Sequence, residues 1–251
     1  MEYLSVEEAK DRNGLRLVLT AGVPGPFGEA AKALFRHHNV DFLPVRQIGG
    51  RDNPELIEWT RHRNAPIALY NNEAPRVRWL ELIELAERLG SGSSLFPDAM
   101  IDRITMVGLI NEIAGENSLI WNARILMLHE TVLAVGEQKA RRNPMLQDYQ
   151  YDQGSVERAK QKVSETIDYL TNHIKHLSSD YLIGDRLSAA DIYYAYISNV
   201  FAPQPHEINP MPDTLRRSYE VVPNLLGDVD SVLVEFRDRI FEKHLETPLT
   251  F

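Results

Sequence analysis

The chain has 251 residues, of which 43% are hydrophobic and 25% are charged, a composition typical of a globular protein with one large domain or two modest ones. Its net charge of −9 argues against nonspecific binding to nucleic acid or to an anionic membrane surface. The absence of cysteine excludes disulfides, thiolate metal sites and a protein thiol as nucleophile. No apolar run is long enough for a membrane span, and the acidic first residues lack a signal-peptide pattern, so we expect a cytoplasmic protein.

The first 90 residues alternate between predicted strands and predicted helices. Short aliphatic runs predict strands at 15–20, 40–45 and 65–70, with a short, frayed fourth strand at 73–77. Apolar residues at helical spacing predict helices at 27–38, 53–60 and 79–89. The loop 21–26 contains two prolines and two glycines, which exclude regular structure there. Pro44 favours a sheet edge for the second strand.

Beyond the flexible linker 90–94, every predicted element is helical. A long helix is predicted from Ala99 to about Arg142, with Asp98 as its cap and one apolar face made by Ile101, Ile104, Val107 and Ile110. Further helices are predicted at 155–177 and, as one or two short pieces, over 221–244. The residues 202–215 contain four prolines and are predicted to form an extended loop.

The stretch 181–196 contains the most specific pattern of the chain. Gly184 and Asp185 predict a turn, after which Ser188 is suited to be a helix N-cap. Asp191 follows three residues later and can return a hydrogen bond to the cap, which makes a capping box with Asp in place of Glu. Apolar residues at helical spacing then predict a buried helix.

This string and the two-part layout resemble a divergent, bacterial-type member of the glutathione transferase superfamily, over nearly the whole chain. The resemblance implies an α/β thioredoxin-like N-terminal domain at residues 1–90 and an all-α helical C-terminal domain at 95–251. It also implies a homodimer that takes glutathione as co-substrate.

The resemblance assigns residues to glutathione binding. The family has a cis proline at the start of the third strand, and the residue before it offers its backbone to the cysteinyl part of glutathione. The matching residues are Ala65 and Pro66. Where the family has Glu-Ser or Gln-Ser to hold the γ-glutamyl group, this chain has Val77 and Arg78, with Arg76 nearby. Either arginine can bind a carboxylate, or both are solvated loop charges.

The position that activates the thiol in the family also differs. A Ser, Tyr or Cys is usual there, whereas this chain has Gly25 before Pro26 and Phe27. Thr20 is the nearest hydroxyl, and it belongs to the predicted first strand. The backbone amides at the start of the helix, including that of Phe27, are the alternative donors to a thiolate.

The resemblance places Trp121 and Arg124 on the helix that lines the pocket for the second substrate, although Trp121 also suits a core position between helices. The adjacent His37 and His38 point in different directions on a helix, so no metal site is predicted.

These features lead to a glutathione-dependent transferase, or a related glutathione-using enzyme, that acts on a small apolar electrophile. One alternative is a catalytically altered member that works as a ligand-binding or interaction protein, because the family's Ser and Glu-Ser residues are missing. Another is an isomerase or an ether-cleaving lyase that uses the same pocket. No nucleic acid or membrane partner is expected.

Overall fold

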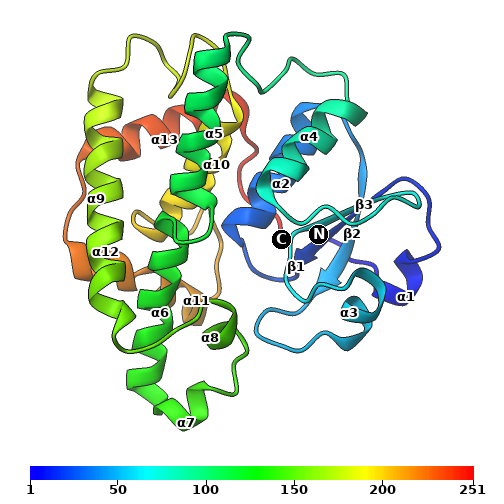
Figure 1. Cartoon of the computed structure of the whole chain (residues 1–251), viewed down its shortest axis with the longest axis horizontal. Coiled ribbons are helices and arrows are strands. Elements are labelled where there is room, and N and C mark those ends of the chain that lie inside the picture. The colour runs from blue at the N-terminus through cyan, green and yellow to red at the C-terminus, as the bar shows by residue number, and fades with distance from the viewer. The chain divides into compact units, whose positions relative to one another are not determined.

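The computed structural model describes all 251 residues and divides into two compact units (Figure 1). Residues 1–95 together with 249–251 form the first unit, and residues 96–248 form the second. The first unit is α/β and the second is helical, which confirms the predicted fold class. No helix combines the length and the apolarity that crossing a bilayer requires.

A three-stranded sheet lies in the middle of the first unit. Its strands are β1 (Leu15–Thr20), β2 (Phe42–Gln47) and β3 (Ile67–Tyr70), in the order β2-β1-β3. β1 runs parallel to β2 and antiparallel to β3. All three strands were predicted within two residues, but the fourth was wrong. Pro75 has no N–H to donate to a ladder, and only Arg76 of that segment forms a bridge, to Ala68.

The helices of the first unit are α1 (Val6–Ala9), α2 (Pro26–His37), α3 (Pro54–Thr60) and α4 (Trp79–Leu89). α2 and α3 each begin with a proline, whose fixed φ and missing N–H suit the first helical position. α2 packs against α4 through its apolar face. α1, which was not predicted, lies in the polar leader and contributes Val6 and Ala9 to a core cluster with Val18 and Val45.

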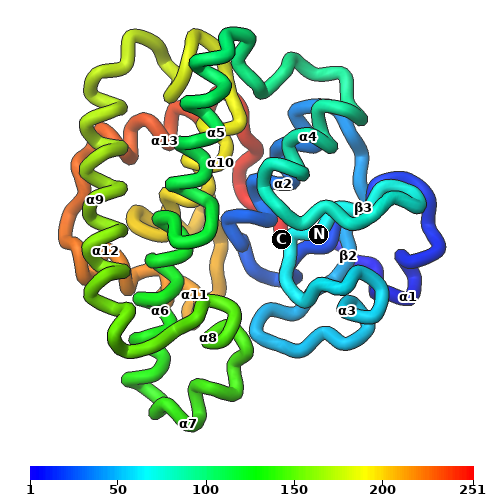
Figure 2. The backbone as a smooth tube through the Cα atoms, in the orientation of Figure 1, coloured from blue at the N-terminus to red at the C-terminus, as the bar shows by residue number.

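Residues 249–251 belong to the first unit, although the helical domain was predicted to extend over 95–251. The Lys32 ammonium of α2 is 2% exposed and donates to the backbone carbonyl of Thr250 at 2.6 Å. The same ammonium pairs with the Glu29 carboxylate at 2.7 Å. Figure 2 shows the C-terminal end of the chain, in red, reaching this unit. A buried ion pair on α2 therefore anchors the tail.

The second unit is built from five longer helices and several short ones. The longer helices are α5 (Met100–Ala114), α6 (Leu119–Val135), α9 (Ser155–Lys175), α10 (Ala189–Ile197) and α13 (Ser231–His244). The short helices are α7 (Glu137–Ala140), α8 (Met145–Asp148), a 3-10 turn at Ser198–Val200, α11 (Asp213–Tyr219) and α12 (Val221–Leu226). Every residue of α10 is buried, and this helix packs against α5 and α13.

The single long helix predicted from Ala99 is wrong, because the chain breaks it twice. α5 ends at Gly115, and α6 begins after Ser118, whose hydroxyl accepts the amide of Trp121 at 3.4 Å. The second break is at Gly136, which has a φ of 81° that β-carbon-bearing residues rarely adopt. Apolar residues continue at helical spacing through both breaks. The Ser118 cap starts a new helix at the first break, and the positive φ of Gly136 ends the helix at the second.

The capping box predicted at the start of α10 is confirmed. The Asp191 carboxylate is fully buried and accepts three hydrogen bonds, each of 2.8 Å, from the Ser188 amide, the Ser188 hydroxyl and the Leu182 amide. It therefore joins the helix start to the turn that precedes it. Burial raises the pKa of Asp191 to about 6, even though all three donors favour the ionised form.

The raised pKa predicts how stability changes with pH. The folded state holds the Asp191 proton more tightly than the unfolded state, whose pKa is 3.8, so this group's contribution is fully present below pH 4. It is lost as the pH rises through 6, by about 3 kcal/mol in total. The difference in unfolding free energy between the parent and Asp191→Asn should change by that amount between pH 4 and 7. In the control, Asp185→Asn at an exposed turn position, the difference should stay flat, and a flat curve for Asp191→Asn would contradict the assignment.

Candidate functional site

Three segments of the first unit meet at the carboxyl end of β1. The antiparallel register pairs Val18 with Ile67, so Ala65, two residues before Ile67, lies level with Thr20 at the end of β1. α2 begins just beyond Thr20, after the loop 21–25. The carboxyl ends of strands are where open α/β sheets bind ligands.

The segment before α4 reaches the same end of the sheet. Arg76 forms an antiparallel bridge with Ala68, and each residue's backbone amide donates to the other's carbonyl at 2.9 Å. The next two residues, Val77 and Arg78, therefore lie beside the start of β3. The residues predicted for the first unit thus gather at one end of one sheet.

The start of α2 offers two open backbone donors. Gly25 is the N-cap and provides no side-chain cap. Its amide donates to the carbonyl of Val23 at 2.9 Å, so it is not free for a ligand. The amides of Phe27 and Gly28 have no acceptor within the chain. Together with the positive end of the helix dipole, they form a place where an anion is stabilised.

The Thr20 hydroxyl is already engaged. It donates to the side-chain carbonyl of Gln47 at 2.7 Å. Gln47 is 2% exposed, and its amide nitrogen donates to the carbonyls of Ile48 at 3.1 Å and Arg63 at 3.4 Å. This network ties β1, β2 and the segment before Ala65 together. The Thr20 proton is therefore used inside the fold and is not directed to a ligand.

The peptide bond between Ala65 and Pro66 is cis, as predicted. Both residues are half-buried, and Ala65 packs on the core cluster through its side chain. The backbone N–H and C=O of Ala65 form no hydrogen bond with any other backbone group of the chain. A bound peptide-like ligand can use both groups as the next strand of a sheet would.

The start of α4 is occupied by the chain's own carboxylate. Glu81 accepts the amide of Val77 at 2.9 Å and that of Arg78 at 3.0 Å. Partial burial opposes ionisation, but these two bonds outweigh it and hold the pKa of Glu81 below its usual value. The Arg76 guanidinium bonds to Glu73 at 3.2 Å and to a backbone carbonyl. The Arg78 side chain is exposed and forms no hydrogen bond or ion pair, although its charge helps to lower the pKa of Glu81, so it is the arginine open to a ligand.

The predicted residues of the helical unit lie on one face of α6. The ring of Trp121 lies 4.8 Å from that of Tyr149, measured between centroids. The Arg124 guanidinium donates to the phenol oxygens of Tyr149 and Tyr219; burial opposes its charge, but these contacts outweigh that and raise the pKa of Arg124. Trp121 is half-buried, so its ring is neither fully enclosed in the core nor fully exposed at the surface.

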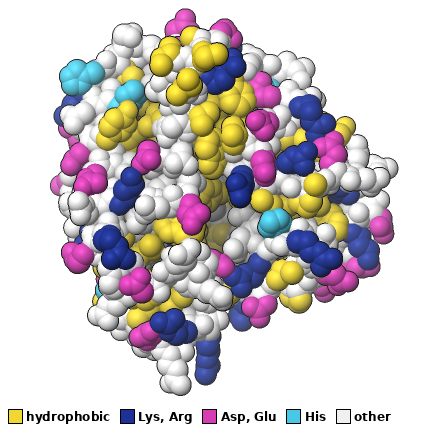
Figure 3. Space-filling view, viewed as in Figure 1, with side chains coloured by type: hydrophobic (Ala, Val, Ile, Leu, Met, Phe, Trp, Pro, Cys, Tyr) yellow, Lys and Arg dark blue, Asp and Glu magenta, His cyan; other side chains and the backbone are white.

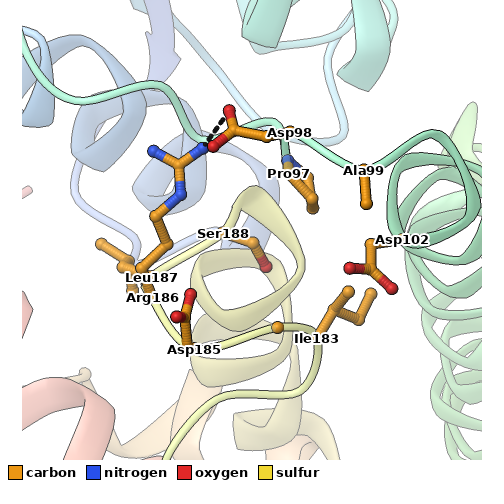
Figure 4. Close-up of a pocket in the computed structure, with 10 residues that line it drawn as sticks. Pro97, Asp98, Ala99, Asp102, Ile183, Asp185, Arg186, Leu187 and Ser188 are labelled. Atoms are coloured by element: carbon orange, nitrogen blue, oxygen red, sulfur yellow. Dashed lines mark hydrogen bonds and ion pairs between the residues drawn. The ribbon is translucent and has the colours of Figure 1, made fainter.

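A cavity of about 200 Å³ lies elsewhere in the helical unit, between the start of α5 and the loop before α10. Figure 4 shows Arg186 reaching Asp98 across one side of it, with 2.9 Å between Nη2 and Oδ1. Arg186 also bonds the carbonyl of Phe96. None of the predicted site residues lines this cavity.

Residues 124–209 match the family model described as "Glutathione S-transferase, C-terminal domain". This part of the helical unit is therefore similar to the C-terminal domain of glutathione S-transferases. No curated protein sequence matches the chain significantly.

Solved structures support the same fold across both units. A glutathione S-transferase domain-containing protein from Marinobacter aquaeolei has a TM-score of 0.65 at 14% identity, covering 92% of this chain and 100% of its own. A glutathione S-transferase from Methylobacterium radiotolerans, in complex with glutathione sulfonate, has a TM-score of 0.60 at 14% identity, covering 94% and 97%. A beta-etherase from Sphingobium has a TM-score of 0.60 at 14% identity, covering 90% and 99%.

Two residues of this transferase fold were missed from the sequence. Gln47 ends an apolar strand and gives no signal of its own, because its role depends on the pairing of Thr20 with Gln47 across two strands. Glu81 had a signal, since an acid three residues after a helix N-cap is the second half of a capping box. It was overlooked because Arg78 is not a usual cap residue.

Glu81 should contribute to the stability of the first unit. Glu81→Gln removes the charge that faces two amides and the helix dipole, so we expect the unfolding free energy to fall by about 1 kcal/mol at neutral pH. The loss should shrink as the pH falls through the lowered pKa of Glu81, where the parent loses the same charge. Urea unfolding measures this. Glu84→Gln, an exposed change on the same helix, is the control, and equal effects for both variants would refute the capping role.

Proposed function

We propose that the chain binds glutathione at the carboxyl end of β1 and uses its thiol in a transferase-type reaction with a small electrophile. The observation that carries this proposal is the pair of open amides of Phe27 and Gly28 at the uncapped start of α2. The free backbone groups of Ala65 lie at the same end of the sheet and suit the cysteinyl part of a tripeptide. Glutathione bound to structural neighbours of the chain agrees with this assignment.

In this proposal the thiolate is held by backbone and not by a side chain. Gly25 has no hydroxyl, and the Thr20 proton goes to Gln47. The amides of Phe27 and Gly28, with the dipole of α2, lower the thiol pKa by favouring its anion.

The γ-glutamyl end is held differently from the family pattern. Glu81 already takes the amides that begin α4, so those donors are not available to a ligand carboxylate. The unpaired guanidinium of Arg78 takes their place and can bind a carboxylate through two parallel hydrogen bonds.

The occupied start of α4 also supports a second candidate function. If Glu81 blocks the γ-glutamyl position, the chain is a ligand-binding or interaction protein that has the fold without the thiol chemistry. A beta-etherase from Sphingobium is among the structural neighbours, which is consistent with the ether-cleaving alternative.

Calorimetric titration with glutathione separates the first two functions. We expect saturable binding below several millimolar, and Arg78→Gln should weaken it about tenfold, because a charge-assisted bond is lost. Arg88→Gln, an exposed change on α4, is the control. No binding by the parent would refute the transferase and favour the interaction protein.

The ultraviolet absorbance of bound thiolate, followed with pH, tests how the thiol is activated. Thr20→Val should leave the thiol pKa nearly unchanged, because its hydroxyl serves Gln47. Gly25→Ser should lower that pKa by about one unit and raise the conjugation rate. A serine fits there, since φ is −62° and an added β-carbon would meet no atom within 4 Å. Loss of the thiolate in Thr20→Val would show that the hydroxyl, and not the amides, is the activating group.

We propose that the chain forms a homodimer through the first two turns of α5. Three apolar side chains there, Met100, Ile101 and Ile104, are 76%, 69% and 61% exposed. Ile101 and Ile104 belong to the apolar face predicted from the sequence, but the chain itself does not cover them. Figure 3 shows apolar side chains gathered where this helix begins. Large apolar side chains that are this exposed and this close together mark an interaction surface.

Sedimentation velocity tests the dimer. The double variant Ile101→Glu/Ile104→Glu should sediment as a monomer at concentrations where the parent is a dimer, because two charges would enter an apolar contact. Leu133→Glu on α6, which is 64% exposed and outside the surface, should leave the dimer intact. A monomeric parent would refute the proposal.

A further inference from the structure

The chain leaves the first unit through residues 90–95, a segment that we call the strap. Its glycines and serines predict a flexible linker, but the structure fastens it to the carboxyl end of α2. The Ser91 amide donates to the carbonyl of His38 at 2.9 Å. The His37 imidazole donates through Nε2 to the carbonyl of Ser93 at 2.8 Å. The strap is therefore docked along the backbone that ends the helix.

Two glycines allow the strap to approach this closely. A β-carbon at Gly90 would lie 2.3 Å from both the β-carbon and the carbonyl oxygen of His38. A β-carbon at Gly92 would lie 2.4 Å from the carbonyl oxygen of His37. No larger residue fits at these distances, so the glycines serve a close backbone contact and not flexibility.

His38 lies beneath the strap and faces a carboxylate of α4. Its side chain is 1% exposed, and its Nε2 is 3.3 Å from Oε1 of Glu87. The same oxygen accepts the amide of Leu95, the last residue of the strap, at 2.6 Å. His37 is the other titratable neighbour, with its ring centroid 5.0 Å from that of His38. The strap itself has no charged residue. One carboxylate oxygen is thus shared between the strap and a buried imidazole.

This arrangement sets the direction of a pH response. Burial lowers the pKa of His38; the Glu87 carboxylate opposes this effect, and His37 adds to it. Once exposed, His38 regains its ordinary pKa of 6.5, so the docked form holds fewer protons than the undocked form. The docked form is therefore stable above pH 6.5 and loses stability as the pH falls below that value. A protonated His38 also competes with the Leu95 amide for the Glu87 oxygen.

We propose that the strap is latched on α2 at neutral pH and released in mild acid, with His38 as the sensing group and Glu87 as its partner. A histidine whose environment changes with conformation is the usual basis of such switches. Release gives the connection to the second unit the mobility that its composition permits. The latch lies at the opposite end of α2 from the candidate glutathione site, and it does not depend on that site.

Hydrogen exchange of the full-length chain tests the latch without any ligand. The protection factors of the Ser91 and Leu95 amides, corrected for the intrinsic effect of pH, are compared at about pH 7.5 and about pH 5.5. They should fall several-fold in acid, towards the limit of about tenfold that a free histidine sets. His38→Gln should abolish this fall, because its side chain stays neutral at both pH values. His62→Gln, which removes an exposed imidazole of the same unit, is the control and should retain it.

A second pair of variants tests the docking itself. Gly92→Ala should lose protection of the strap at both pH values, because its β-carbon would overlap the His37 carbonyl. Ser91→Ala is the matched control, since the Ser91 side chain is exposed and only its amide holds the strap. Full protection of the strap in Gly92→Ala would overturn the close contact.

Two further results would overturn the latch. One is protection of the parent that does not change with pH, and the other is a fall that persists in folded His38→Gln. If His38→Gln does not fold, Glu87→Gln decides. It removes the neighbour that favours protonated His38 in the docked form, so the fall should move closer to the limit of about tenfold. An unchanged fall in Glu87→Gln would refute the role of this pair.

Discussion

The buried carboxylate of Asp191 is the interaction on which the helical unit depends. α10 is buried along its whole length, so its position fixes that of α5 and α13, which pack on it. Three donors from two chain segments converge on Asp191, and without it the Leu182 amide and both Ser188 donors would be buried and unpaired. Each such group costs about 1–3 kcal/mol. The carboxylate thus specifies where α10 begins and how the preceding turn meets it.

Three helices of the chain have a carboxylate that caps their N-terminus, as Asp191 does, whereas α2 has none. α1 is capped by Glu8, α4 by Glu81 and α10 by Asp191, in each case an acid three residues after the N-cap. At α2 the N-cap is Gly25, and the acid in the first turn, Glu29, pairs with Lys32 and does not return to the cap. The positive end of α2 therefore faces outward unpaired. An incoming anion gains what the other helices obtain from their own side chains.

Local patterns predicted much of this fold from the sequence. The three strands, the proline-led helices and the box at Ser188 and Asp191 follow from short-range rules, and all were confirmed. The failures concern interactions between distant or competing segments. Helical spacing hid the break at Gly136, because periodicity does not report the φ of one residue. The engagement of Thr20 depends on Gln47, 27 positions away along the chain, which only strand pairing brings opposite. At the candidate site, the sequence did not predict that Glu81 accepts the amides of Val77 and Arg78.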